Sequence, residues 1–141
     1  MTVRPLNKSD IPFLISARET FPDAWNENML LSAFGAGNFY GFIAEDGEKA
    51  GFLTYSVNGD TADLQDIFVV PEKRRRKTGA SLLDAFVSAA RKKGLKKLFL
   101  EVRESNMPAV NLYKAAGFGF LSVRKKYYPD GENAWVFVKE L

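Results

Sequence analysis

The order of apolar and polar residues changes its period along the chain, and each period predicts a kind of element. Alternation with a period of two is typical of strands, whereas apolar residues at i, i+3 and i+4 are typical of helices. The first pattern predicts strands over residues 2–6, 39–45, 49–57, 61–69, 97–102, 118–125 and 135–139. The second predicts helices over residues 11–18, 26–34, 78–93 and 106–116. Strands joined through helices around a mixed sheet predict an α/β or α+β fold.

Turn residues separate these segments. Asp46-Gly47 and Asn58-Gly59 are strong hairpin signals, because these residue types tolerate the positive φ of tight hairpin turns. They predict an antiparallel meander of strands in the middle of the chain. Residues 22–25 (Pro-Asp-Ala-Trp) predict a further turn before the second helix.

Capping residues delimit the predicted helices. Ser9-Asp10 can cap the first helix, with Pro12 in its first turn, and Asn26 can cap the second. Glycines favour helix C-termini because they adopt the left-handed conformation without strain. The glycines expected to end helices are Gly35, Gly37, Gly94 and Gly117.

The length and composition are those of one soluble domain. A chain of 141 residues, 46% hydrophobic and 26% charged, is long enough to bury one core. No apolar run approaches the roughly 20 residues of a membrane span, and the first residues lack the apolar stretch of a secretory signal. We expect a single domain over residues 1–141, in the cytoplasm.

Two residue types are missing, and this narrows the chemistry. The chain contains no cysteine and no histidine. It therefore lacks thiolate nucleophiles and thiolate metal ligands, and also the commonest general base. Acid–base chemistry must use carboxylates, tyrosine, lysine, backbone or water, and we expect no metal.

Five cations stand together at residues 73–77 (Lys-Arg-Arg-Arg-Lys), although the net charge is only +3. They lie between a strand that stops before Pro71 and the helix that begins at Thr78. A helix N-terminus offers free N–H groups and a partial positive charge, where phosphates bind readily. Gly79 and Ala80 would leave the backbone accessible to a pyrophosphate. The alternatives are a solvated basic face or a patch for RNA, and no Walker lysine pattern accompanies the run.

The segment around these cations, residues 67–83, resembles the acyl-CoA loop of the GNAT superfamily of N-acetyltransferases. That loop has Gln or Arg, two residues, Gly, one residue, then Gly or Ala. Arg74 matches its first position and Gly79 its last, whereas Lys77 stands where the family has the first glycine. If Lys77 adopts positive φ, its backbone is strained by about 1 kcal/mol or more.

The resemblance extends over nearly the whole chain. Residues 100–106 and 109–118 are similar to the second half of the family, and most similar to the RimI-type ribosomal-protein alanine N-acetyltransferases. Residues 126–131 and 22–25 also match that group. The resemblance implies an acetyl-CoA-dependent N-acetyltransferase. It also implies a mixed, mostly antiparallel sheet of about seven strands, splayed at its centre and flanked by about four helices.

The resemblance also implies a coenzyme site. Asn106 would contact the pantetheine arm, and the backbones of Phe68 and Val70 would bond the acetyl carbonyl and the pantetheine amides. Asn106 would serve equally as a helix N-cap, and Phe68 and Val70 as a buried strand end. The loop residues expected to hold the pyrophosphate are Arg74, Arg75, Arg76, Lys77, Thr78, Gly79 and Ala80.

Two residues are candidates for catalysis. Glu101, at a strand end, would take the proton of the acceptor amine through a water. The alternative is a carboxylate that pairs with Arg103 or a lysine. Tyr113, which the resemblance places near the sulfur, would protonate the leaving thiolate, because a phenol pKa near ~10 lies close to a thiol pKa near ~8.5. The alternative for Tyr113 is a core aromatic on the buried stripe of a helix.

The acceptor would be a cationic amine, for which acidic and aromatic groups are suitable partners. Trp25 and Tyr128 would otherwise be ordinary core or edge aromatics, and Asp66 a strand residue that faces solvent. The candidate acceptor contacts are Trp25, Gln65, Asp66, Tyr127 and Tyr128.

Three functions compete. The first is direct transfer, in a ternary complex, from acetyl-CoA to a protein N-terminal α-amine such as that of a ribosomal protein, by a monomer or a homodimer. The second is acetylation of a small amine: a polyamine, an amino acid or an aminoglycoside. The third is a nucleic-acid-binding module that uses the basic loop. The lack of aromatics among the cations argues against this third function, and we expect neither nucleic acid nor membrane as a partner.

Overall fold

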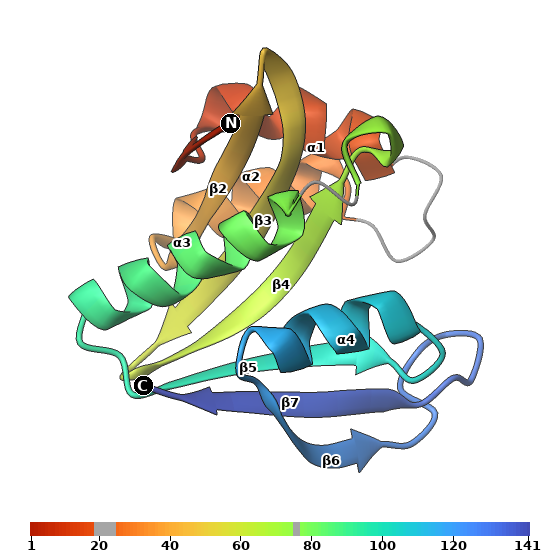
Figure 1. Ribbon diagram of the computed structural model, residues 1–141. Coiled ribbons are helices and arrows are strands. Elements are labelled where there is room, and N and C mark those ends of the chain that lie inside the picture. The colour runs from red at the N-terminus through yellow and green to blue at the C-terminus, as the bar shows by residue number, and fades with distance from the viewer. Residues whose placement is uncertain (19–24, 75–76) are drawn as a thin grey trace.

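The computed structural model describes residues 1–18, 25–74 and 77–141. The strands form one mixed sheet in the order β1-β2-β3-β4-β5-β7-β6 (Figure 1). Every neighbouring pair is antiparallel except β4 and β5, which are parallel. The strands are β1 (Thr2–Pro5), β2 (Phe39–Asp46), β3 (Glu48–Asn58), β4 (Thr61–Val69), β5 (Lys97–Arg103), β6 (Gly119–Arg124) and β7 (Ala134–Glu140). The predicted fold class and strand number are confirmed.

Helices cover both faces of this sheet. In Figure 1, α3 crosses one face of the β2–β4 half, α1 and α2 lie behind the same half, and α4 lies over β5. The helices are α1 (Ile11–Arg18), α2 (Glu27–Ala36), α3 (Thr78–Lys92) and α4 (Met107–Ala115), with short 3₁₀ turns at Lys8–Asp10 and Pro71–Lys73. Among the described residues, no helix has both the length and the apolar character needed to cross a bilayer.

The sheet separates two apolar cores. On the α3 and α4 face, Leu83 and Phe86 pack with Val110 and with inward residues of the strands. On the α1 and α2 face, Leu14 and Leu30 pack on a second cluster. Each helix therefore buries one apolar stripe, which is what holds it against its half of the sheet.

The parallel contact between β4 and β5 is short. Thr61, Ala62 and Asp63 pair with Lys97, Leu98 and Phe99, and no pairing continues beyond them. Figure 1 shows the two strands diverging from this point, so that β4 leads to one half of the molecule and β5 to the other. The predicted splay at the sheet centre is confirmed, and it opens the sheet where β4 still continues for six residues, 64–69.

A β-bulge lies on β4 beside this opening. Thr54 pairs with Asp66 and Tyr55 pairs with Leu64, so Gln65 is an extra residue without an opposite partner. Successive strand residues face opposite sides of a sheet, and one inserted residue reverses that alternation. The bulge therefore turns Asp66 away from the α3 face and toward the α1 face.

Two helix ends differ from the prediction. The cap of the first helical segment is Asn7, whose side chain accepts from the Ser9 N–H at 3.0 Å, while the Asp10 carboxylate accepts from the Asn7 N–H at 2.9 Å. The predicted Ser9-Asp10 cap is thus replaced by a reciprocal capping box that begins two residues earlier, at Asn7. Gly35 lies inside α2, and only Gly37, with φ of 80°, ends it.

Other boundaries are as predicted. Asn26 caps α2 by accepting from the Met29 N–H at 2.9 Å. Gly94 and Gly117 follow α3 and α4 with positive φ. Of the predicted turn at residues 22–25, only Trp25 belongs to the described residues.

Candidate active site

The diverging ends of β4 and β5 enclose a cleft with an empty volume of about 1270 Å³. The cleft brings together seven of the residues that the sequence singled out, from four separate parts of the chain. These are Trp25, Gln65, Asp66, Glu101, Asn106, Tyr113 and Tyr128.

Glu101 and Tyr113 reach this cleft from opposite faces of the sheet. Leu100 and Val102, which flank Glu101 on β5, are buried in the core under α3 and α4. Since side chains alternate along a strand, Glu101 projects from the other face. Tyr113 descends from α4 and lines the same opening. A reaction that takes place in the opening between β4 and β5 would therefore have a carboxylate on one side and a phenol on the other.

Glu101 carries an unsatisfied oxygen. Its Oε1 lies 3.5 Å from Arg124 Nε, whereas its Oε2 is buried and has no hydrogen-bond partner among the described residues. The predicted alternative, a pair with Arg103 or a lysine, is wrong, because the partner is Arg124. The nearby Glu101 carboxylate raises the pKa of the Tyr127 phenol, although the Tyr127 hydroxyl forms no hydrogen bond with Glu101 Oε2 in the part of the structure that is described. A buried carboxylate oxygen without a donor is rare in proteins, and it is ready to accept one from a bound ammonium group or water.

Tyr113 is both a core residue and a cleft residue. Its side chain is 4% exposed and its ring meets Phe118 edge to face at 6.3 Å. Burial raises the pKa of Tyr113, the charge of Asp66 raises it further, and Arg18 lowers it. The phenol therefore keeps its proton at neutral pH. The expected close match between its pKa and that of a thiol is wrong, because desolvation raises the pKa of the phenol further above that of a thiol.

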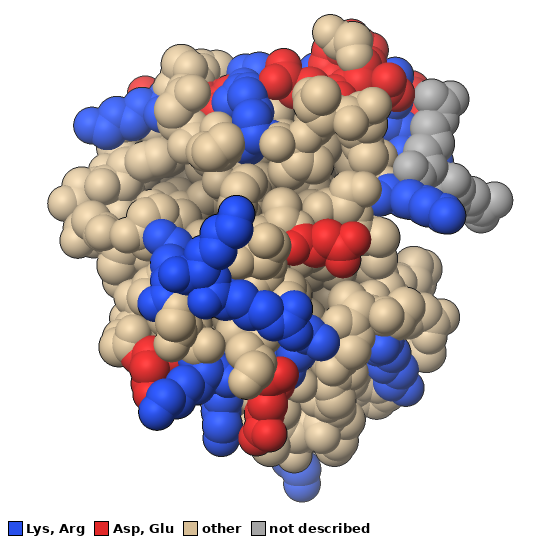
Figure 2. Space-filling model, turned by 60° about the vertical axis from the view of Figure 1, so that its left-hand side comes forward, with Lys and Arg blue, Asp and Glu red and all other residues tan. Residues whose placement is uncertain are grey.

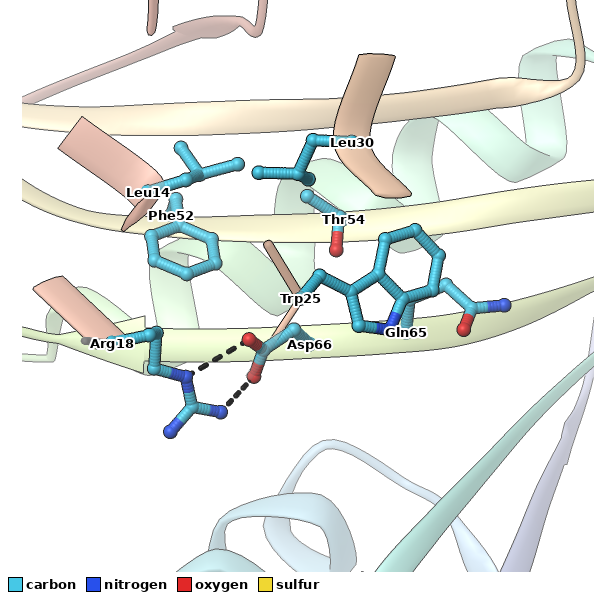
Figure 3. A pocket seen from close by; sticks show the side chains of 8 residues that line it. All are labelled: Leu14, Arg18, Trp25, Leu30, Phe52, Thr54, Gln65 and Asp66. Carbon is cyan, nitrogen blue, oxygen red and sulfur yellow. Dashed lines mark hydrogen bonds and ion pairs between the residues drawn. The ribbon is translucent and has the colours of Figure 1, made fainter. Parts of the chain in front are cut away.

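Asp66 is paired rather than solvent-facing. Arg18 Nε donates to its Oδ2 at 2.9 Å and Arg18 Nη2 donates to its Oδ1 (Figure 3). Burial raises the pKa of Asp66 and Arg18 opposes that shift. The pair closes a small side pocket that opens off the cleft. Its lining comprises Leu14, Arg18, Trp25, Leu30, Phe52, Thr54, Gln65 and Asp66.

Of the four remaining acceptor candidates, all but Tyr127 line the cleft. Trp25 stacks on Phe39 with ring centroids 5.7 Å apart, and it lines both the cleft and the side pocket. Gln65 Nε2 donates to Ser56 Oγ at 2.9 Å. Tyr128 lines the cleft, whereas Tyr127 is exposed and does not, although its ring meets Tyr128 edge to face at 5.1 Å.

The N-terminus of α3 is left without a side-chain cap. Lys77 is the N-cap residue, its φ is 62°, and its side chain makes no capping hydrogen bond. The strain expected for a lysine at positive φ is thus present. Thr78 Oγ1 donates instead to the Lys73 carbonyl at 3.3 Å. The first amides of α3 therefore remain available to an anion, which fits a pyrophosphate.

Gly79 and Arg74 are placed by contacts that the motif alone did not predict. A Cβ on Gly79 would lie 3.1 Å from Leu112 Cδ2, so a glycine lets α3 approach α4 closely. Arg74 Nε donates to the Val69 carbonyl at 3.0 Å, and its guanidinium lies 5.6 Å from the Phe68 ring centroid. Ala80 is half-buried in the first turn of α3. The predictions for Arg75 and Arg76 concern positions outside the described residues.

The backbone roles expected of Phe68 and Val70 are corrected by the strand register. The Val70 N–H donates to the Ala50 carbonyl at 2.8 Å. Because antiparallel partners alternate between bonded and non-bonded pairs, the groups of Phe68 are also directed at β3. The edge of β4 that faces the cleft carries instead the N–H and carbonyl groups of Ile67 and the N–H of Val69, whose carbonyl accepts from Arg74. Sequence reasoning missed these two residues, because strand parity is not visible without the register.

Asn106 satisfies one expectation directly. Its side chain accepts from the Ala109 N–H at 3.3 Å and so caps α4, and the residue also lines the cleft. The cap is confirmed, while its contact with pantetheine stays a prediction.

Charges of opposite sign occupy different faces of the molecule. Figure 2 shows Lys and Arg side chains gathered on the side where α3 ends. There, Arg91, Lys92 and Lys139 line a groove of about 670 Å³. The cleft, by contrast, is lined by Asp66, Glu101 and Asp130 together with two arginines. The cations at the C-terminal end of α3 favour an anionic ligand in that groove. In the cleft, Arg18 and Arg103 pair with Asp66 and Asp130, so the carboxylate left to attract a cationic ligand is chiefly that of Glu101.

Comparisons with known proteins agree with this geometry. Residues 8–118 match the model of the Acetyltransferase (GNAT) family. The [ribosomal protein bS18]-alanine N-acetyltransferase of Escherichia coli (strain K12) is 34% identical over 135 residues, which cover 94% of this chain and 90% of that protein. An N-alpha-acetyltransferase of Sulfurisphaera tokodaii is 34% identical over 114 residues, covering 71% of this chain and 68% of its own.

Solved structures share the fold. The crystal structure of the ribosomal-protein-S18-alanine N-acetyltransferase from Escherichia coli superposes with a TM-score of 0.89 at 31% identity, covering 99% of this chain and 92% of that one. Arabidopsis thaliana NAA60 in complex with acetyl-CoA superposes with a TM-score of 0.85 at 20% identity, covering 99% and 98% of the two chains.

Proposed function

The chain belongs to the acetyltransferase (GNAT) family, with acetyl-CoA as its acyl donor, and we propose that it acetylates the N-terminal α-amine of a protein. The relatives named for acetylation of ribosomal protein bS18 favour a ribosomal-protein N-terminus as the acceptor. The observation that carries the proposal is the buried Oε2 of Glu101, which has no hydrogen-bond partner in the described part of the chain and lies at a cleft that Tyr113 lines from the other side.

The coenzyme would lie on the face of the sheet that α3 and α4 cover. The uncapped amides of α3 would hold its pyrophosphate, and the backbone groups of Ile67 with the N–H of Val69 would bond its extended arm. When bound there, acetyl-CoA supplies an acetyl thioester to the opening between β4 and β5. Asn106, at the start of α4, borders the same path.

The amine would enter from the α1 and α2 side, where the acids lie. Glu101 would accept a proton from the ammonium group, directly or through a water, so that the amine nitrogen carries a free electron pair. Tyr113 Oη would donate a hydrogen bond to the charge that develops across the opening. Because the chain contains neither cysteine nor histidine, we expect the amine to attack directly in a ternary complex, without a covalent acyl-enzyme.

An α-amine is a more suitable acceptor for a site with Glu101 as its base than a lysine side chain is. Its pKa near ~8 leaves a useful fraction deprotonated at neutral pH, whereas a lysine with pKa near ~10.4 needs a stronger base. The side pocket closed by Arg18 and Asp66 is small, and it would suit an acceptor whose first side chain is no larger than the methyl group of alanine.

An acceptor comparison tests the proposal. The purified protein is supplied with acetyl-CoA and, in separate reactions, a peptide that copies the alanine N-terminus of bS18, the same peptide with its α-amine formylated, spermidine, and free alanine. Thiol release gives the rate and mass spectrometry locates the acetyl group. We expect the highest kcat/KM for the unblocked peptide, with the acetyl group on its α-nitrogen, and none of this activity in the formylated control. Turnover of spermidine or alanine without turnover of the peptide would overturn the proposed acceptor.

A further inference from the structure

We propose that Arg103 is a positioning residue that fixes the loop between β6 and β7, and with it Tyr128, against the acceptor side of the cleft. The inference rests on the proposed function, because it assigns Tyr128 to acceptor binding. Sequence reasoning considered Arg103 only as a partner for Glu101, and the structure gives it different partners.

Arg103 makes three contacts with this loop. Its Nη1 donates to Asp130 Oδ2 and to Glu132 Oε1, each at 2.8 Å. The carbon of its guanidinium lies 4.0 Å from the centroid of the Tyr128 ring. A planar guanidinium that stacks on an aromatic face while donating from its edge fixes the ring plane as well as its position. Arg103 therefore determines where Tyr128 stands at the cleft wall.

Hydrogen bonds within the loop also form a turn, so Arg103 contacts a segment that is already ordered. The Gly131 N–H donates to the Tyr128 carbonyl at 2.8 Å, and the Tyr128 N–H donates to the Glu132 carbonyl at 3.2 Å. The Glu132 N–H donates to Asp130 Oδ1 at 3.0 Å. These bonds make residues 128–132 one tight unit, and a restraint at Arg103 is transmitted to every member of it.

A second carboxylate oxygen fastens this unit to the end of β5. Glu132 Oε2 accepts from the Ser105 N–H at 3.1 Å, while Glu132 Oε1 accepts from Arg103. Hydrogen bonds from the Ser105 side chain and from Arg103 lower the pKa of Glu132, and the Ser105 backbone N–H lowers it further. The Glu132 side chain is only 20% exposed, against 62% for Asp130, so Glu132 is the stronger anchor.

A preformed acceptor wall lowers the cost of binding. A loop that must be ordered when the acceptor arrives costs about 0.5–1.5 kcal/mol for each side chain immobilised. With Arg103 in place this ordering precedes binding, and without it part of the ordering of Tyr128 would have to accompany acceptor binding. The effect should therefore appear in acceptor KM, because the reacting groups Glu101 and Tyr113 belong to other elements.

Two substitutions at Arg103 test this. Arg103→Gln removes the charge and the stacking plane, and Arg103→Lys keeps the charge without the planar fork. We expect acceptor KM to rise about tenfold in Arg103→Gln and less in Arg103→Lys, with kcat and the Kd for acetyl-CoA changed less than about twofold. Lys97→Gln is the matched control, since Lys97 forms an exposed ion pair with Glu140 at the other end of β5, and its KM should equal that of the wild type.

Glu132→Gln separates positioning from direct contact. If Arg103 acts through the loop, Glu132→Gln also raises acceptor KM. An unchanged KM in Glu132→Gln beside a raised KM in Arg103→Gln would mean that Arg103 touches the acceptor itself, and would overturn the inference. The KM is measured with whichever amine the acceptor comparison identifies, so a wrong proposed acceptor does not decide this question.

Amide hydrogen exchange provides a readout without any acceptor. In Arg103→Gln we expect faster exchange confined to residues 128–133, with α3 and α4 unchanged. Unchanged exchange in that loop would refute the positioning role of Arg103, whatever amine the protein acetylates. Faster exchange with an unchanged KM would show that the loop does not position the acceptor.

Discussion

We expect Tyr113→Phe to lower kcat by about 10²-fold or more, which is the usual contribution of a well-placed proton donor. The substitution removes one hydroxyl from the cleft wall and leaves the ring in its packed position. Because the burial of Tyr113 raises the pKa of its phenol, the hydroxyl carries its proton at every pH at which the protein would be assayed. The Kd for acetyl-CoA should change less than about twofold, since the lost interaction matters chiefly as charge develops.

Tyr55→Phe is the matched control for this change. Tyr55 is also fully buried, burial likewise raises the pKa of its phenol to about 12, and it stacks on Tyr40 and Phe42 away from the cleft. Single-turnover and steady-state rates of both variants compare the two hydroxyls directly. If Tyr113→Phe kept wild-type kcat, Tyr113 would be a core residue only.

The second large effect concerns stability. We expect Asp10→Ala to lower the free energy of unfolding by about 3 kcal/mol, because it leaves two cations facing each other without their common partner. Asp10 is fully buried and its carboxylate accepts from Arg4 at 2.8 and 2.9 Å, while Lys49 Nζ lies 2.8 Å away. Its bond from the Asn7 N–H fixes the start of the first helical segment. Urea unfolding followed by circular dichroism measures the loss.

The same carboxylate sets a direction for pH dependence. Burial alone would raise the pKa of Asp10, but its hydrogen bonds from Arg4 and Lys49 outweigh burial and hold the pKa well below its usual range. The stabilisation is therefore complete above the unfolded pKa near ~4 and is lost as pH falls below it. In Asp10→Asn, the free energy of unfolding should depend less on pH in this acid range. Glu140→Gln is the control, because Glu140 is exposed and pairs only weakly with Lys97. Its free energy of unfolding should stay within about 0.5 kcal/mol of the wild type. Equal acid sensitivity in Asp10→Asn and wild type would contradict the assigned network.

Local patterns sufficed for most of the fold. The meander followed from Asp46-Gly47 and Asn58-Gly59, because hairpin turns depend on the residues within them. The extent of α3 followed from its apolar spacing, because that helix buries a single stripe. Thr2–Pro5 was likewise found as a strand. These elements needed no knowledge of what lies opposite them.

The site was harder to predict, because long-range contacts decide it. Arg18 and Asp66 are 48 positions apart in the chain, and only the bulge at Gln65 turns them toward each other. The roles expected of Phe68 and Val70 failed by one residue for the same kind of reason, since a strand pattern does not say which backbone groups face a neighbour. Family resemblance located Glu101 and Tyr113, but it did not supply the partner of Glu101 or the direction of the pKa shift of Tyr113.

Transfer without an acyl-enzyme is tested by initial velocities measured while acetyl-CoA and the alanine peptide are both varied. Two substrates that enter one cleft from opposite faces of the sheet must be bound together before the acetyl group moves. The double-reciprocal lines should therefore intersect to the left of the ordinate. Parallel lines, together with an acetylated protein that survives removal of acetyl-CoA, would mean that the chain itself carries the acetyl group and would contradict the roles given to Glu101 and Tyr113.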